Sequence, residues 1–581
     1  YARLYTVIQQ QKSKNPTSIL VDAGDYSMGT LFQTVNGKEA LELRIMGFMG
    51  YDITTFGNHE FDFRSGGLAK SLLAAKNSND RIPKLVASNY IFPELNDNSA
   101  KAKGLADLKS AFQELDIPPS IIIEKNGLKI GFIGLMGKEA DEDAPMSGVE
   151  FQNIVEAAKP LVQKLKEQNV DLIIALSHSG TFANPAKSED EILAKSIADI
   201  DVIVSGHTHT TLNQPIIHGQ TMIVSSGSYG RNLGKLVIEP AANKRWQVKE
   251  YKIIPINNQI EKNVLVNQKI AQYKQLVQSE YLNQFGLQFD EVLAYSPFDF
   301  VEYSKLGRQL REEPIGNLIG DSYIKSVSEF DKHNFDPIAA AVVPVGMIRD
   351  SIVKGRLTTP MLYKINPLGI GPDQIAGYPI VELYLTGKEL WAVAEVDGSV
   401  STIMPDAQLY LAGLRYSVNP NRMIFNRVTD LVLVNQSGQT SEIDKNKLYR
   451  VVAGLYSAQM LPVVRKKSMG LLSIEPKDKD GNIITDFEKQ IIYTDSTKTK
   501  ELKEWFAIAH YLQSFPKVNG VAEIPDHYQQ THNRKNVISS YKPTEIFSQL
   551  NGIGITLYCV IVLIFAGIGF GAIKLKKKLT T

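Results

Sequence analysis

The stretch LIIALSHS, Leu172 to Ser179, places five apolar residues directly before a histidine flanked by serines. An uninterrupted apolar run of this length is typical of a strand that is buried on both faces. An amphipathic helical pattern, Ile154 to Lys166, precedes it. Short buried strands that alternate with amphipathic helices indicate an α/β layered domain.

The same pattern extends over the first 250 residues and predicts further strands at Ile19 to Val21, Leu85 to Ala87, Ile130 to Leu135, Val202 to Val204 and Met222 to Val224. A polar helical pattern at 257–284 follows. We therefore predict a first domain over 1–252, a linker with a helix over 253–290, and a second α/β or α+β domain over 291–533.

The two ends of the chain carry further signals. The sequence begins at Tyr1 without an initiator methionine, so we expect an upstream segment that includes a signal peptide. From Ile553 to Ile573 no residue is charged, and 21 helical residues span about 31 Å, enough for a hydrocarbon core of ~30 Å. Four lysines follow within 574–581. The pattern predicts a stalk over 534–551, a single transmembrane helix over 552–573 and a cytoplasmic tail, with the preceding domains outside the cell.

The composition excludes several classes of protein. Apolar residues make up 43% of the 581 residues and charged residues 22%, as in ordinary globular proteins. The net charge of +1 provides no basic field for a nucleic acid polymer. Because Cys559 is the single cysteine, disulfide scaffolds and cysteine-ligated zinc sites are excluded.

Four polar fragments each follow a predicted strand, and together they hold four of the nine histidines. In α/β folds, such loops at the carboxyl ends of strands assemble functional sites. Carboxylate, amide and imidazole groups together suit divalent metals such as zinc, manganese or iron. The fragments are Gly24-Asp25, Gly57 to Asp62, Ser177 to Ser179, and Gly206 to His209.

These fragments resemble the motifs of the calcineurin-like metallophosphoesterases, and within them of the 5'-nucleotidase and UDP-sugar hydrolase family. The resemblance implies a four-layer α/β-β/α first domain with two divalent ions (Zn, Mn, Co or Mg) and a 5'-nucleotidase-type α+β second domain. It implies that Asp25 bridges both ions, that Asn58, His178 and His207 complete one ion, and that His209 binds the other. The family's Asp-x-His motif would lie upstream of Tyr1.

Catalytic roles follow from the same resemblance. His59, next to the implied ligand Asn58, would stabilise transition-state charge or protonate the leaving oxygen. Asp62 lies three residues further on and would fix the tautomer of His59. For Asp62, a helix cap or a surface acid is the alternative.

The second domain also matches the family, with differences. Asn317 lies in its opening signature, and Arg349 closes a Gly-x-Ile-Arg-like turn. The resemblance implies that arginine binds substrate charge and that two aromatic rings hold the base. Tyr456 supplies one ring, whereas Leu368 stands where the family usually has phenylalanine. We therefore expect weaker base stacking.

The sequence thus predicts a cell-surface dimetal phosphohydrolase that converts nucleoside monophosphates to nucleoside and phosphate. One alternative keeps this chemistry and changes the substrate to a UDP-sugar, a 2',3'-cyclic nucleotide or a non-nucleotide phosphate ester. A second alternative is a surface binding protein without turnover.

Overall fold

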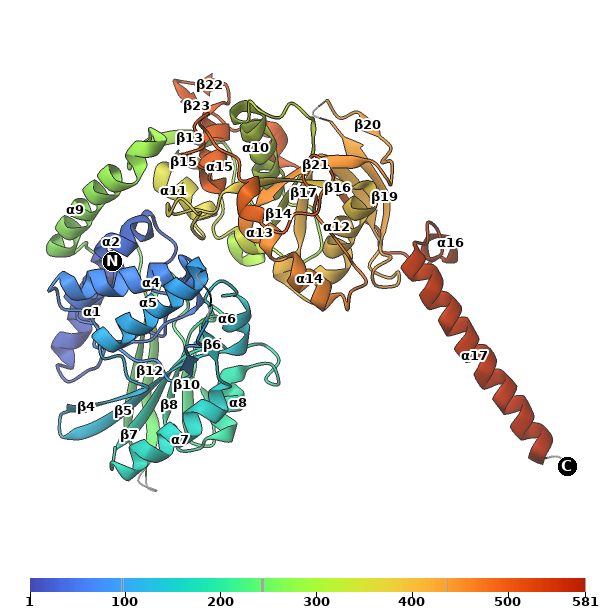
Figure 1. Ribbon diagram of the computed structural model, residues 1–581. Coiled ribbons are helices and arrows are strands. Elements are labelled where there is room, and N and C mark those ends of the chain that lie inside the picture. The colour runs from blue at the N-terminus through green and yellow to red at the C-terminus, as the bar shows by residue number, and fades with distance from the viewer. Residues whose placement is uncertain (96, 98, 242–244, 436, 580–581) are drawn as a thin grey trace. The chain divides into compact units, whose positions relative to one another are not determined.

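The computed structural model describes residues 1–579 except 96, 98, 242–244 and 436, with side chains described up to residue 568. The chain divides into two compact units (Figure 1). The first contains Tyr1–Phe289 together with Leu368–Ile370, and the second contains Asp290–Pro367 together with Gly371–Thr581.

A six-stranded sheet forms the centre of the first unit. Its order is β4-β5-β7-β8-β10-β9, and β5, β7, β8 and β10 run parallel to one another. The two strands at the edges, β4 and β9, are antiparallel to their neighbours. The strands are β4 Ser120–Lys125, β5 Leu128–Met136, β7 Leu172–His178, β8 Val202–Ser205, β9 Ile216–His218 and β10 Thr221–Val224.

Side chains alternate between the two faces of this sheet, and both faces are buried. Ile133 and Leu135 of β5 pack in a cluster with α7 and α8. Ile130 and Phe132 of the same strand pack in a cluster with residues of β1, β11 and β12. Because successive strand residues point to opposite faces, two covered faces require the near-continuous apolar runs seen in the sequence.

A second layer of strands separates this sheet from a further group of helices. It consists of the pair β1-β2 and the antiparallel ribbon β11-β12. Buried residues of α3, α4 and α5 form their own cluster with Phe56 and Leu85 beside β1 and β2. The elements are β1 Ile53–Thr54, β2 Lys84–Leu85, β11 Asn232–Pro240, β12 Trp246–Pro255, α3 Leu41–Met49, α4 Arg64–Asn77, α5 Ala100–Glu114, α7 Ile154–Glu167 and α8 Glu189–Ser196.

Most predicted elements of the first unit are present, with one correction. The predicted strand Ile19 to Val21 is wrong, because only Val21 makes a β-bridge, to Ile53. The Leu20 N–H donates to the Asp52 side chain at 2.8 Å instead of joining a ladder. The helix predicted within 257–284 is α9, Val264–Glu280, whose first turn is capped by the side chain of Asn263. Further helices are α1 Ala2–Lys14, α2 Asn36–Glu39 and α6 Lys138–Glu142, and the remaining strands are β3 Tyr90–Ile91 and β6 Glu150–Phe151.

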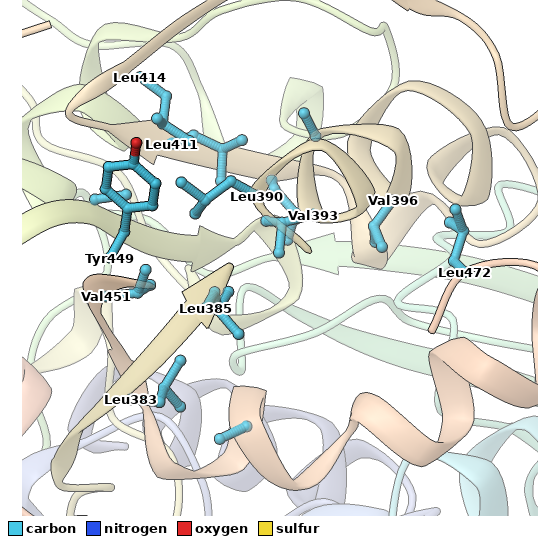
Figure 2. Packing of buried hydrophobic residues seen from close by; sticks show 14 of the residues in the cluster. Leu383, Leu385, Leu390, Val393, Val396, Leu411, Leu414, Tyr449, Val451 and Leu472 are labelled. Atoms are coloured by element: carbon cyan, nitrogen blue, oxygen red, sulfur yellow. The ribbon is translucent and has the colours of Figure 1, made fainter. Parts of the chain in front are cut away.

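Two four-stranded sheets enclose a helix in the second unit. One has the order β16-β21-β14-β17 and the other β20-β19-β18-β24. Helix α12 packs against both, and Figure 2 shows Leu390, Val393 and Val396 of α12 among strand residues such as Leu385 and Leu411. The elements are α12 Gly387–Ser399, β14 Ile338–Pro344, β16 Ile380–Thr386, β17 Leu409–Ala412, β18 Leu414–Val418, β19 Val428–Val434, β20 Thr440–Ser441, β21 Leu448–Gly454 and β24 Lys535–Val537.

Helix α10 covers the opposite face of the first of these sheets. A Cβ atom added at Gly316 would clash with the Tyr410 ring, and one at Gly320 would lie 2.7 Å from the Ala412 side chain. Tyr410 and Ala412 alternate along β17 with Leu409 and Leu411, which face α12, so the two helices lie on opposite sides. Helix α10 also packs against α15. These two helices are α10 Pro314–Phe330 and α15 Glu504–Gln513, and the other elements of the unit are α11 Thr359–Ile365, α13 Leu455–Gln459, α14 Leu461–Lys467, β13 Val292–Ser296, β15 Gly355–Thr358, β22 Lys517–Val518 and β23 Val521–Ala522.

The segment 534–551, predicted as a stalk, is tied to the second unit. Its strand β24 pairs with β18, and Lys535 forms a buried ion pair with Asp397 at 2.9 Å. The Arg422 guanidinium donates to the Ser548 carbonyl at 2.6 Å, after the short helix α16, Pro543–Ile546. These contacts hold the segment in the fold.

The last helix, α17, runs over Gly552–Leu579 and contains the predicted membrane-spanning residues. Among the residues that the structure describes, no helix is long and apolar enough to cross a membrane. The predicted span is therefore not supported, and its residues 569–573, like the predicted tail 574–581, lie outside the residues whose side chains are described.

Candidate active site

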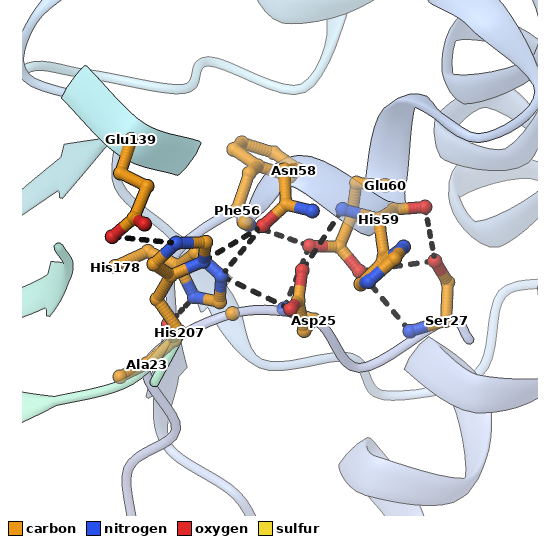
Figure 3. A network of polar contacts seen from close by, with 12 residues as sticks. Ala23, Asp25, Ser27, Phe56, Asn58, His59, Glu60, Glu139, His178 and His207 are labelled. Atoms are coloured by element: carbon orange, nitrogen blue, oxygen red, sulfur yellow. Dashed lines mark hydrogen bonds and ion pairs between the residues drawn. The ribbon is translucent and has the colours of Figure 1, made fainter. Parts of the chain in front are cut away.

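Four loops of the first unit bring polar side chains together at one edge of the sheet (Figure 3). His178 is the last residue of β7, and His207 follows the end of the parallel neighbour β8. Asn58 and His59 open a short 3₁₀ helix, Asn58–Phe61, after β1. Asp25 follows the bridge at Val21. Parallel strands end at the same edge, which explains why residues so distant in sequence meet.

The amide oxygen of Asn58 lies at the centre of this group. It is 3.1 Å from His178 Nε2 and 3.1 Å from His207 Nδ1. The Asp25 carboxylate lies 3.0 Å from the same His178 Nε2. The structure thus brings together Asp25, Asn58, His178 and His207, as the sequence motifs suggested.

The tautomer of His178 is set by the backbone. Its Nδ1 lies 2.7 Å from the Ala23 carbonyl, which can only accept, so Nδ1 carries the proton. The Nε2 atom consequently faces the oxygens of Asp25 and Asn58. Burial opposes a charge on the ring, but the Asp25 carboxylate outweighs it and raises the pKa of His178 to about 9. Burial also opposes ionisation of Asp25, whose pKa is nevertheless lowered by His178 and His59.

These atoms fit a divalent cation. An amide oxygen, a carboxylate oxygen and an imidazole nitrogen converge on one another, and such mixed donors suit borderline divalent metals. Burial and the charge of His178 lower the pKa of the nearby His207 to about 3, so this ring is neutral, which is the form that binds metal. Because the pKa of His178 is raised to about 9, that ring would have to release its Nε2 proton to bind an ion. Within the described part of the chain no group of three or more His, Cys, Asp and Glu side chains is arranged as a metal site. The donor set described here also includes the amide oxygen of Asn58.

Three residues of these loops have a left-handed backbone. Asp25, His207 and His209 have φ values of 60°, 65° and 55°, in the left-handed region that residues with a side chain rarely adopt. Such residues persist where the surrounding structure holds them, and they cluster at functional sites.

Gly57 allows the Asn58 loop to pass close to Asp25 and His178. A Cβ atom at this position would lie 2.6 Å from His178 Nε2 and even closer to Asp25 Oδ1. Its φ of −110° and ψ of −170° suit any residue, so the need for glycine here is steric.

Glu60 holds two of the loops together, a role that the sequence motifs did not reveal. Its carboxylate accepts the backbone N–H groups of Asp25 at 2.8 Å, Gly57 at 2.6 Å and Ser27 at 3.1 Å. Burial and the charge of Asp25 raise the pKa of Glu60 to about 7. A glutamate three residues after the N-cap Gly57 gives one half of a capping box, in which the glutamate accepts the N-cap N–H, and this is the signal that could have found it.

His59 is paired with Asp62. Its Nδ1 lies 3.0 Å and 3.1 Å from the two Asp62 carboxylate oxygens, and its backbone N–H donates to Asp25 Oδ1 at 2.9 Å. The carboxylate accepts from Nδ1, which directs Nε2 away from Asp62. The proposed catalytic ring is thereby fixed next to a proposed ligand.

His209 has a different environment. Its ring packs edge-on against Tyr229, with centroids 5.5 Å apart. It is close enough to the cluster for its charge to help lower the pKa of His207.

In the second unit, the predicted substrate residues have specific contacts. Asn317 is buried in α10 and donates to Glu312 at 2.5 Å, so its amide supports the fold. Arg349 lies over the Tyr303 ring at 6.0 Å. Tyr456 stacks on Tyr378, with centroids 5.4 Å apart and an interplanar angle of 29°. Tyr378 was not among the predicted site residues.

The remaining predicted substrate residue, Leu368, is buried. It is one of three residues that group with the first unit.

Comparison with protein families identifies both parts of the chain. Residues 1–211 match the profile of the calcineurin-like phosphoesterases, and residues 294–460 match that of the 5'-nucleotidase, C-terminal domain. The chain joins a calcineurin-like phosphoesterase domain to a 5'-nucleotidase C-terminal domain. It is a phosphoric ester hydrolase. Calcineurin-like phosphoesterases are metal-dependent, typically with two ions, in agreement with the donor set around Asn58.

Relatives extend the similarity over most of this phosphoesterase. Mouse 5'-nucleotidase is 26% identical over 545 residues, which are 89% of this chain and 87% of the mouse protein. The apyrase of Aedes albopictus is 27% identical and covers 79% of this chain and 77% of its own. The trifunctional nucleotide phosphoesterase protein YfkN of Bacillus subtilis is 27% identical over 78% of this chain, which spans only 30% of that longer protein.

Solved structures show the same fold. The 5'-nucleotidase precursor from Thermus thermophilus superposes with a TM-score of 0.67 at 22% identity, covering 93% of this chain and 94% of its own. The sulfate thiohydrolase SoxB of the same organism superposes with a TM-score of 0.60 at 17% identity, over 93% of this chain and 83% of its own. Because these two structures have different names and activities, the fold alone does not define the substrate.

Proposed function

We propose that this phosphoesterase hydrolyses nucleoside monophosphates to nucleoside and phosphate, with two divalent ions. The convergence of the Asp25, Asn58 and His178 donor atoms beside the His59–Asp62 pair carries the proposal. The names of the relatives, two of which are 5'-nucleotidase and apyrase, support a nucleotide as the substrate.

Each residue has a stated task in this proposal. Asp25, Asn58, His178 and His207 would hold one ion, and His209 with Asp25 would hold the second. When bound, such ions lower the pKa of a water and polarise a phosphoryl oxygen. His59 holds its proton at Nε2 when it is protonated, because Nδ1 is engaged by Asp62. From there it stabilises charge on the phosphoryl group or gives the proton to the leaving oxygen.

The second domain is proposed to bind the nucleoside part. The stacked rings of Tyr456 and Tyr378 offer a rigid aromatic surface for a base, and Arg349 offers a positive charge for the substrate. Leu368 contributes an apolar surface without aromatic stacking. Base discrimination is therefore expected to be weak.

A second candidate substrate class is supported by the same observation. Because Tyr456 already stacks on Tyr378, and Leu368 replaces an expected aromatic ring, the base site differs from a two-ring clamp. The same chemistry could then act on a UDP-sugar, a 2',3'-cyclic nucleotide or a non-nucleotide phosphate ester. A binding protein without turnover is the least favoured hypothesis, because the polar cluster around Asn58 has the form of a reaction centre.

A hydrolysis panel tests the proposal directly. The full chain is supplied with Zn²⁺, Mn²⁺, Co²⁺ or Mg²⁺ and assayed for phosphate release from AMP, UMP, UDP-glucose, 2',3'-cyclic AMP and p-nitrophenyl phosphate. We expect the highest kcat/KM with the monophosphates. Preference for another ester selects the second candidate, and no hydrolysis of any ester with any metal would refute the enzyme assignment.

A further inference from the structure

A small cavity lies behind the His59–Asp62 pair in the first unit. Its volume is about 20 Å³, and its lining includes Tyr26, Asn36, His59, Glu60 and Asp62. Two polar atoms in this lining are buried and lack a hydrogen-bond partner, namely the Tyr26 hydroxyl and the Asn36 Oδ1 atom. Buried polar atoms in folded proteins are almost always hydrogen-bonded, so the pair requires an explanation.

The size of the cavity matches a single water molecule. A water needs roughly 10 to 15 Å³ of such space and two to four polar partners. A cavity of about 20 Å³ therefore has room for a water. The remaining lining contains polar and apolar residues, namely Ser27, Gln33, Phe63, Gly67, Leu68 and Ser71.

The two atoms are also complementary to a water. The Tyr26 hydroxyl has a proton to donate, whereas an amide oxygen such as Asn36 Oδ1 can only accept. A single water accepts from the first and donates to the second. Its other hydrogen is then available for an acceptor, and the Asp62 carboxylate lines the same cavity while it accepts from His59 Nδ1.

We propose that this cavity is a binding site for one ordered water that links Tyr26 and Asn36 to the Asp62–His59 pair. Tyr26 and Asn36 are then positioning residues, because they act on the reaction only through the orientation of Asp62. The expected effect of this water on kcat rests on the proposed function, in which His59 acts on the substrate. The water site itself rests only on the cavity and its unpartnered atoms.

The packing around Tyr26 allows its hydroxyl to be removed while its ring contacts are kept. The Tyr26 ring packs against Phe56 with centroids 6.4 Å apart, and Tyr26→Phe keeps this contact. Tyr90 provides a matched control, because its ring also packs on Phe56 while its hydroxyl donates directly to the Phe56 carbonyl at 3.2 Å. Within the described part of the chain, Tyr90 is not one of the residues that line the cavity.

The test compares single and double variants of the full chain. We expect Tyr26→Phe and Asn36→Leu each to lower kcat by about 10-fold, the lower end for loss of a residue that orients a catalytic group, with KM and bound metal unchanged. The double variant should lose no more than either single variant, because both disturb the same water. Asn36→Asp keeps an acceptor oxygen and should therefore retain most of the kcat that Asn36→Leu loses. As the control, Tyr90→Phe combined with Asn36→Leu should change kcat by the product of the two single effects.

A high-resolution crystal structure gives the independent readout. A water within hydrogen-bond distance of Tyr26 Oη and Asn36 Oδ1 supports the inference, whereas an empty cavity or a direct protein partner for both atoms overturns it. Losses in kcat that add in the double variant also overturn it. If the water is present but no nucleotide is hydrolysed, the proposed function fails and the water site stands.

Discussion

Gly57→Ala is the sharpest test of the candidate site, because it changes the space around the ligands and little else. The backbone at Gly57, with φ −110° and ψ −170°, accepts alanine without strain. The added methyl group would lie 2.6 Å from His178 Nε2 and closer still to Asp25 Oδ1. Real Cβ atoms keep at least 3.0 Å from such neighbours, whereas this one would lie 2.5 Å from His178 Cε1, so the His178 ring must move by about 0.5 Å and Asp25 by more.

This displacement sets the expected magnitude. Catalytic groups tolerate errors of roughly 0.5 Å, and a misplacement of about 1 Å costs around 10²-fold in rate. We therefore expect kcat/KM for a nucleoside monophosphate to fall by about 10- to 100-fold, equal to about 1.4 to 2.7 kcal/mol. Metal affinity should fall as well, because the two displaced side chains are both proposed ligands.

The assay measures phosphate release and bound metal for the full chain. Gly66→Ala is the matched control, since Gly66 lies in helix α4 and a Cβ atom there would meet only Gly104 Cα at an ordinary 3.5 Å. The control should keep its activity and gain about 0.4 to 1 kcal/mol in stability. Wild-type metal content together with wild-type kcat/KM in Gly57→Ala would show that Asp25 and His178 are not ligands.

Three further variants test the proposed bridging ligand, the proposed catalytic histidine and a buried glutamate of the second unit. Asp25→Ala should abolish hydrolysis and lower bound metal, because it removes the proposed bridging ligand; unchanged metal by mass spectrometry would contradict that role. His59→Ala should retain its metal and lose about 10²- to 10⁴-fold in kcat, and loss of metal would identify it as a ligand instead. Burial raises the pKa of Glu504 from its ordinary 4.5 to about 7, so the folded state keeps a proton that the unfolded state releases. Stability from this group is full below pH 4.5 and is lost as the pH rises through about 7, so Glu504→Gln should flatten the fall in Tm over this range; an unchanged slope would show that Glu504 does not titrate there.

The central sheet could be predicted because its burial leaves a plain sequence signal. Apolar runs at Ile130 to Leu135 and Leu172 to Leu176 became β5 and β7, with boundaries shifted by at most two residues. The ribbon β11-β12 left no comparable signal, because its strands are only partly buried and carry many polar residues. Ile19 to Val21 gave a false signal, since apolar character alone does not say that a side chain such as Asp52 will take the backbone hydrogen bond.

The clustering of the candidate site residues could be predicted from the sequence, whereas the contacts that support them could not. Motif order and the edge of a parallel sheet were enough to bring Asn58, His178 and His207 together. The roles of Glu60 and Tyr26 depend on how two loops fold over each other, which no spacing in the sequence expresses. The assignment of metal ligands and catalytic residues stays a prediction until the variants are measured.

The Glu60 contacts also explain how the proposed ligand Asp25 keeps a strained backbone. Asp25 and His207 have left-handed backbones, and such conformations cost about 1 to 3 kcal/mol each. The Asp25 loop is held by the Glu60 carboxylate, and the His178 ring by the Ala23 carbonyl. Each of these bonds joins a proposed ligand to a different loop. Side-chain replacement at Glu60 therefore removes a constraint on Asp25 and Gly57 together, even though Glu60 holds no proposed ion.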